Sequence, residues 1–324
     1  MSAPEVRPAR RWLTGRAVRI AFYVATAAAL VWVVLSIDWS ELGTVRLSLP
    51  WAAGAIATGM LFRYLGALVW RSVLKGLGAD HMPPVRVLAE IYAKTWLARY
   101  IPGTAPWIAG KVLLAAEQGI SRSRLAVSSV VEAAAKIVAS GVVSLVLLAL
   151  DPRIGEISTA LRWLVVLGAL VLLLVMTPPV FNRLLAVMFR LLKRGSLVEV
   201  GWPVIGTTLT MYGAVQLVSG LANALLVCAI LPGTEASDML FLMGAFGFSA
   251  VIGMLTPLVP SGLGTRDASL AVLLLLVMSP PEAALVVLVS RVWNLALDVV
   301  FWVVTLLAKR TVHAPADSVG AGAP

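Results

Sequence analysis

Long apolar runs constrain the fold more than any other feature of this 324-residue sequence. A helix needs about 20 residues to cross a bilayer. Six runs are this long, at 17–37, 50–70, 125–150, 161–181, 203–231 and 283–308. Only 13% of the residues are charged, where a soluble domain has about 25%. We therefore expect an all-α polytopic integral membrane protein with a single transmembrane domain at 17–308.

Two more apolar regions, 85–119 and 239–279, are interrupted by Pro and Gly. Their arms, about 11 to 18 residues long, are short for a full crossing. A broken backbone is tolerated at membrane depth only where protein buries it or it lines a polar cavity. We expect six full spans plus two re-entrant helical hairpins, or eight or more helices if the hairpin arms cross fully.

The two breaks resemble each other. When Pro102 is aligned with Pro260, a base follows within ten residues, and another charge follows about thirty residues on, inside the next span. These residues are Lys111 and Glu132 in the first case, and Arg266 and Arg291 in the second. The halves 17–150 and 161–308 are then inverted repeats, because one hairpin enters from each side of the membrane. The alternative is that Pro and Gly recur by chance.

The distribution of Lys and Arg sets the orientation. With the Arg-rich segment 1–16 in the cytoplasm, sixteen bases are cytoplasmic, three lie outside and seven of the 26 lie at membrane depth. This bias follows the positive-inside rule and predicts a cell membrane protein with both termini cytoplasmic. An aromatic belt is expected from Trp39, Trp51 and Trp163 outside and from Trp70 and Trp202 inside. We expect the tail 309–324 to be disordered.

Ionisable residues at membrane depth are the candidate functional residues. The seven bases are Arg63, Lys94, Arg99, Lys111, Lys136, Arg266 and Arg291, and the acidic residues are Glu132, Asp267 and Asp298. Glu132 and Lys136 are four residues apart and can pair on one helix face. Arg291 and Asp298 share a face about 10 Å apart. The alternatives are neutralisation that fixes helix packing, and snorkelling of Arg99 and Lys111.

Phosphate is the anion that this set of residues suits best. Arg binds phosphate in a bidentate manner, and helix N-termini near Pro106 and Gly264 favour anions. We expect the substrate-binding residues to be Arg266, Arg291, Arg99, Lys111 and Arg63. The residues that keep the backbone open would be Pro102, Gly103, Pro260, Gly262 and Gly264.

These two spaced motifs resemble the lysylphosphatidylglycerol synthase transmembrane-region family of flippase-like membrane proteins. The residues that carry the resemblance are Arg99, Pro102, Gly103, Lys111, Gly119, Ile120, Glu132, Pro260, Gly262, Gly264, Arg266, Asp267 and Arg291. The resemblance covers about 17–308 and implies a lipid-translocating domain. The stretch after residue 308 has no room for the synthase domain of some members, so we expect a stand-alone membrane domain. The family commonly has Arg at Lys111 and Glu at Asp267; both residues here keep the charge, but a Lys cannot bind a phosphate in a bidentate manner.

The sequence therefore predicts a translocase of an anionic phospholipid or a polyprenyl-phosphate-linked lipid. The alternative is a proton-coupled secondary transporter of a small anion. We expect no enzyme, because no nucleophile stands beside a base and no carboxylate pair shares a motif. No metal, cofactor or nucleic acid is expected. A membrane lipid is the expected partner, with a homo-oligomer or an enzyme of lipid or glycan synthesis as further partners.

Overall fold

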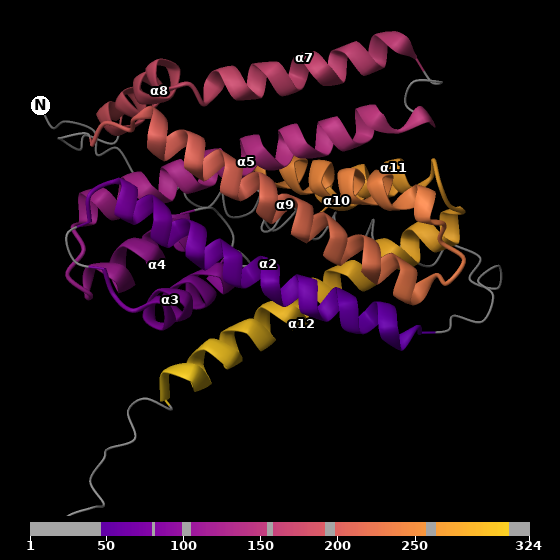
Figure 1. Ribbon diagram of the computed structural model, residues 1–324, viewed down its shortest axis with the longest axis horizontal. Coiled ribbons are helices and arrows are strands. Elements are labelled where there is room, and N and C mark those ends of the chain that lie inside the picture. Colours follow the sequence, from indigo (N-terminus) through magenta and orange to yellow (C-terminus); the bar gives the residue numbers. More distant parts are fainter. Residues whose placement is uncertain are drawn as a thin grey trace, which may run out of the picture.

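The computed structural model describes residues 47–79, 82–98, 105–153, 158–191, 198–256 and 264–310. These ranges are helical throughout, without a strand (Figure 1). The helices are α2 (Leu49–Gly76), α3 (Val85–Leu97), α4 (Ala105–Ala116), α5 (Arg122–Leu150), α7 (Thr159–Val175), α8 (Pro178–Leu191), α9 (Trp202–Ile230), η3 (Ala236–Asp238), α10 (Met239–Met254), α11 (Thr265–Leu274) and α12 (Pro280–Arg310). The expected first span 17–37 and the segments 1–16 and 311–324 lie outside the described residues.

Four long helices, α2, α5, α9 and α12, form the body of the molecule. They contain 28, 29, 29 and 31 residues, or about 42 to 46 Å at 1.5 Å per residue. Each coincides with an expected span, and α2, α5 and α12 extend a few residues beyond it. Proline near the start of α2 and α9 supplies a helical φ where no backbone donor is needed. Among the described residues, five helices are long and apolar enough to cross a membrane, the fifth being Ala236–Met254.

The expected single span 161–181 is wrong in one respect, because the helix ends at Val175. A second helix, α8, starts at Pro178 and makes an angle of 67° with α7. Pro178 and Pro179 provide no backbone N–H, and a proline disfavours helical backbone in the residue before it. The last amide donors of α7 bond three residues back, Met176 to Leu173 and Thr177 to Leu174. The chain therefore turns at Thr177.

Two pairs of short helices correspond to the regions 85–119 and 239–279. Helices α3 and α4 contain 13 and 12 residues, and α10 and α11 contain 16 and 10. At 1.5 Å per residue α3, α4 and α11 are about 15 to 20 Å long, less than the roughly 30 Å hydrocarbon core, whereas α10 together with η3 is long enough to cross it. In Figure 1 the α3–α4 pair lies at one end of the molecule and the α10–α11 pair toward the other.

Helices α2 and α9 pack against each other in antiparallel fashion along their whole length. At one end the amide of Ser48 donates to the carbonyl of Ala229 at 2.9 Å. At the other, Gly76 of α2 lies against Val204 near the start of α9. Helices α3 and α10 pack in matching ways: α3 contacts α2 and α12, while α10 contacts α9 and α5. The partners correspond if α2, α3, α4 and α5 are matched with α9, α10, α11 and α12.

Glycine allows close contact between the backbones of neighbouring helices. A methyl group at Gly220 of α9 would lie 2.9 Å from Cβ of Met243 on α10, and 3.2 Å from its backbone Cα and O atoms. Backbone atoms cannot swing aside as a side-chain end can. Small residues let membrane helices approach closely in this manner.

We predict that Gly220→Ala separates α9 from α10 and lowers the thermal midpoint of the detergent-solubilised protein by several degrees. Overpacked cores lose about 1–3 kcal/mol. Gly206→Ala is the matched control on the same helix, because a methyl group there meets nothing within 4 Å. Heating followed by size-exclusion chromatography measures both. Equal midpoints for the two variants would contradict the close contact.

Candidate functional site

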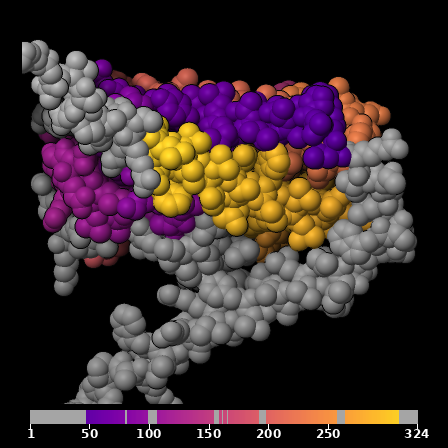
Figure 2. All heavy atoms as spheres, turned by 90° about the horizontal axis from the view of Figure 1, so that it is seen from below, coloured from indigo at the N-terminus to yellow at the C-terminus, as the bar shows by residue number. Residues whose placement is uncertain are grey.

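A stripe of polar residues runs along one face of α12. Arg291, Asn294 and Asp298 are separated by three and four residues and therefore share a face. Each bonds to another helix. The opposite face is apolar and exposed, with Val292 and Val300 at 70% and 46% exposure. Figure 2 shows α12 beside α2 on one face of the molecule. The polar stripe of α12 thus faces the other helices, and the apolar face of α12 forms part of the molecular surface.

Arg291 binds Asp267 on α11. Its Nε donates to Oδ1 at 2.6 Å and its Nη2 donates to Oδ2 at 2.8 Å. Asp267 also accepts from the amide of Gly264 at 3.0 Å, which caps the start of α11. Gly264 has a φ of +87°, a conformation that glycine adopts without strain. The Asp267 carboxylate thus caps the start of α11 and also holds the guanidinium of Arg291 on α12.

Arg63 joins α2 to α12 at the other end of the stripe. Its Nε donates to Oδ1 of Asp298 at 2.7 Å, and its Nη2 donates to the carbonyl of Asn294 at 2.8 Å. Its Nη1 donates to the carbonyl of Gly59 within α2 at 2.9 Å. The two charged side chains are only 2% and 0% exposed. Such burial of a charge pair is tolerated because nearly every donor has a partner.

Lys111 on α4 is enclosed by aromatic rings. Its ammonium donates to Glu132 on α5 and lies 4.8, 4.4 and 4.6 Å from the ring centres of Trp70, Tyr92 and Trp107. Both charged side chains have zero exposure. Cation–π attraction strengthens when the cation is desolvated, so the rings take the place of water around the ammonium. We call these four residues with Lys111 the aromatic box.

Trp96 on α3 connects the box to the stripe. Its indole Nε1 donates to Asp298 at 3.3 Å, and its ring lies 6.4 Å from that of Trp107. Lys136 on α5 lies 3.7 Å from the centre of the same ring. Through α12, these contacts link α11 to α4, the second helices of the two short pairs. Its charged residues are four bases and three acids: Arg63, Lys111, Lys136, Arg291, Glu132, Asp267 and Asp298.

The structure brings together most of the predicted charges that it describes. Glu132 contacts Lys111 on another helix, where the sequence offered Lys136 as a partner on its own helix. Arg266, in the first turn of α11, is partly buried. Lys94, expected at membrane depth, is exposed. Arg99, Pro102, Gly103, Pro260 and Gly262 lie outside the described residues.

The aromatic residues around the charges were missed by the sequence interpretation. Trp70 was expected in the interfacial belt but is fully buried. Tyr92 and Trp96 are four residues apart in α3 and stack with ring centres 5.6 Å apart. That spacing places two aromatic rings on one helix face, beside a helix that carries a buried base. This pattern is the signal by which the box could have been found.

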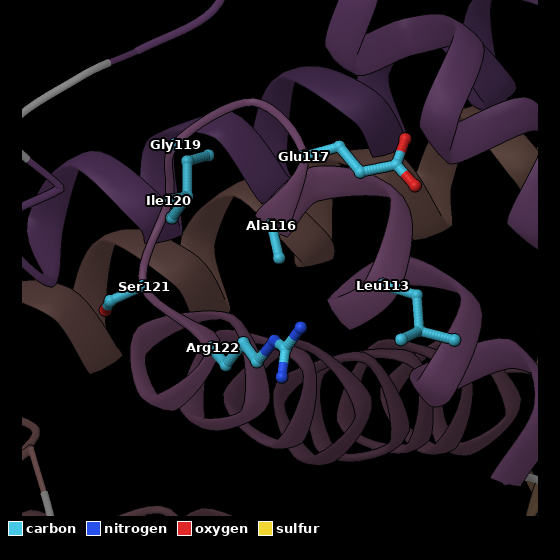
Figure 3. A pocket seen from close by; sticks show the side chains of 7 residues that line it. All are labelled: Leu113, Ala116, Glu117, Gly119, Ile120, Ser121 and Arg122. Carbon is cyan, nitrogen blue, oxygen red and sulfur yellow. The ribbon is translucent and has the colours of Figure 1, made fainter.

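A cavity of about 450 Å³ lies where α4 passes into α5 (Figure 3). Its lining includes Leu113, Glu117, Ile120 and Arg122, and the Arg122 guanidinium points into it. Both charged side chains are exposed, so the cavity is an open depression apart from the buried network. No group of three or more His, Cys, Asp or Glu that could hold a metal ion occurs within the described ranges.

The family model described as lysylphosphatidylglycerol synthase TM region matches residues 17–307. The chain belongs to this family. It is accordingly a multi-pass membrane protein, in agreement with its long apolar helices. No curated protein matches the chain. Four of the residues that carry the resemblance to the family are charges of this network: Lys111, Glu132, Asp267 and Arg291.

We predict that Arg63→Gln and Asp298→Asn each destabilise the protein by about 3 kcal/mol, because each leaves a buried charge without its partner. The double variant should lose less than the sum of the two. Unfolding in mixed micelles by SDS titration measures this coupling. Arg153→Gln is the control: Arg153 binds Asp238 at 2.6 Å but is 32% exposed, so less than about 1 kcal/mol is expected. Additive losses would show that the pair is not coupled.

Proposed function

We propose that the protein is a flippase-like translocase of a lipid with an anionic, phosphate-bearing head group, acting in the cell membrane with both termini cytoplasmic. The observation that carries this proposal is the network of four bases and three acids inside an apolar helical body. Charged groups at membrane depth are costly and mark substrate pathways. An excess of base gives this interior an attraction for anions.

Arg291 and Arg266 are the best candidates for the phosphate contact. The Arg291 side chain is 23% exposed, whereas Arg63 and Lys111 are almost fully enclosed. Arg266 lies next to Asp267, the partner of Arg291, and is partly exposed. Two oxygens of a phosphate can accept the same fork of donors that the Asp267 carboxylate accepts in this structure. We assign binding to Arg266 and Arg291, and positioning of the helices to Arg63 and Lys111.

The position of α12 suits a lipid substrate. Its polar face holds the network, and its other face exposes Val292, Val299 and Val300 to the surroundings. A head group that passes between α12 and its neighbours reaches polar groups while the tail stays in the bilayer. A soluble anion would need no such access from the side. This arrangement favours a lipid over the alternative, a proton-coupled transporter of a small anion.

The matching packing of the two halves supports alternating access. In each half, a charge on the second short helix pairs with a charge on the next long helix: Lys111 with Glu132, and Asp267 with Arg291. The signs are exchanged between the halves. We propose that the halves are inverted repeats and that their short helices are re-entrant hairpins, so that rocking of one half against the other exposes the site to either side. No chemical reaction is proposed.

We predict that purified protein in liposomes moves a fluorescent phosphatidylglycerol analogue between leaflets, measured by dithionite quenching. Arg291→Gln should slow this movement by about tenfold, because hydrogen bonds to a charged group contribute about 1.5–3 kcal/mol. Arg291→Lys should restore only part of the rate, since it keeps the charge and loses the fork. Arg266→Gln should also slow it.

Arg86→Gln is the control, because Arg86 lies on the exposed surface of α3. Movement of every tested anionic lipid at the protein-free rate would refute the proposal. Uptake of a soluble anion that depends on a pH gradient, without lipid movement, would favour the alternative.

A further inference from the structure

Helix α8 has a surface that the proposed transport does not use. It contains 14 residues, Pro178–Leu191, and is turned 67° away from α7. Helix α7, with 17 residues, is about 26 Å long and can cross most of the hydrocarbon core alone. A helix that turns away at the end of such a span runs closer to the membrane plane than to the normal. Figure 1 shows α8 at the same end of the molecule as α3 and α4.

One face of α8 fixes it to the body of the protein. Phe181, Leu185 and Phe189 are 4%, 3% and 5% exposed and belong to the hydrophobic cluster formed with α2, α5 and α9. Asn182 adds two hydrogen bonds to the segment before α9. Its Nδ2 donates to the carbonyl of Val200 at 3.0 Å, and its Oδ1 accepts from the amide of Val200 at 3.1 Å. The orientation of the helix about its own axis is therefore set.

The outward side of α8 is divided into two arcs. Arg183 and Arg190 are both exposed and seven residues apart, so they lie within about 20° of each other around the axis. An apolar arc lies about 40–100° from Arg183. It consists of Leu184, Val187 and Leu191, which are 52%, 51% and 79% exposed. An apolar arc beside a basic arc is the pattern of a helix in the membrane interface.

Charge selects the lipid that this surface fits. Helix α8 contains two bases and no acidic residue. Lys75, at the end of α2, and Arg122, at the start of α5, are further exposed bases at this end of the molecule. Basic residues next to the interface attract anionic lipid head groups.

We infer that α8 lies in the membrane interface and holds anionic lipid head groups through Arg183 and Arg190, while Leu184, Val187 and Leu191 enter the acyl region. These lipids are bound neighbours of the protein and not its cargo. The network around α12 lies on other helices, so this inference does not depend on the transport activity.

The test uses the full chain with Cys228, its one cysteine, replaced by Ala, and an environment-sensitive fluorophore at Val187→Cys. The protein is placed in vesicles that contain either brominated phosphatidylglycerol or the same amount of brominated phosphatidylcholine. Bromine quenches a nearby fluorophore. We expect the anionic lipid to quench about twofold more strongly, and high salt to reduce the difference.

Two controls separate charge from depth. In the double variant Arg183→Gln/Arg190→Gln, the ratio of quenching by brominated phosphatidylglycerol to quenching by brominated phosphatidylcholine should fall to about one. Both lipids should still quench the fluorophore, because the apolar arc still lies in the bilayer. A fluorophore at Leu170→Cys on α7, where Leu170 is 58% exposed, should show no preference for either lipid.

Equal quenching by both lipids around the unchanged arginines would overturn the inference. So would the lack of quenching by either lipid, which would mean that water or a partner protein covers this arc.

Discussion

A charge inside an apolar helical body needs a partner at hydrogen-bonding distance, and the structure depends on this requirement. Arg63 and Asp298 are almost without exposure, and Arg63 donates to a carboxylate and two carbonyls. Leaving any of these donors without an acceptor in a low-dielectric interior costs several kcal/mol. The pair therefore sets the position of α12 relative to α2. The same holds for Asp267 and Arg291 between α11 and α12.

Much of the architecture could be predicted from the sequence, because apolar run length is a direct consequence of membrane thickness. The runs at 50–70, 125–150, 203–231 and 283–308 correspond to α2, α5, α9 and α12. The run at 161–181 misled because hydropathy does not register the absent donors of Pro178 and Pro179. Those residues are apolar enough to extend a span and unsuited to continue its helix.

Which charges would be buried was easier to predict than which charges would meet. A sequence contains only distances along the chain, so spacing within one helix suggested Lys136 as the partner of Glu132 and placed Arg291 on the same face as Asp298. The structure pairs Glu132 with Lys111, and Asp298 with Arg63, residues 21 and 235 positions away. Such contacts depend on how the helices pack, and helix packing depends on shape. The aromatic box was missed for the same reason, because Trp70, Tyr92 and Trp107 come from three helices.

The tryptophans beside the buried cations also give the protein an optical signal of its own. Trp70 and Trp96 are buried and lie against a cation, whereas Trp51, Trp163 and Trp202 are exposed at 48%, 67% and 62%. Indole emission responds to nearby charge and to polarity, so the two groups of tryptophans differ in their surroundings and hence in their spectra. A movement of Lys111 or Lys136 alters the field at the buried indoles and leaves the exposed ones unchanged. The intrinsic fluorescence of the unlabelled protein can thus report on rearrangement at the centre of the molecule.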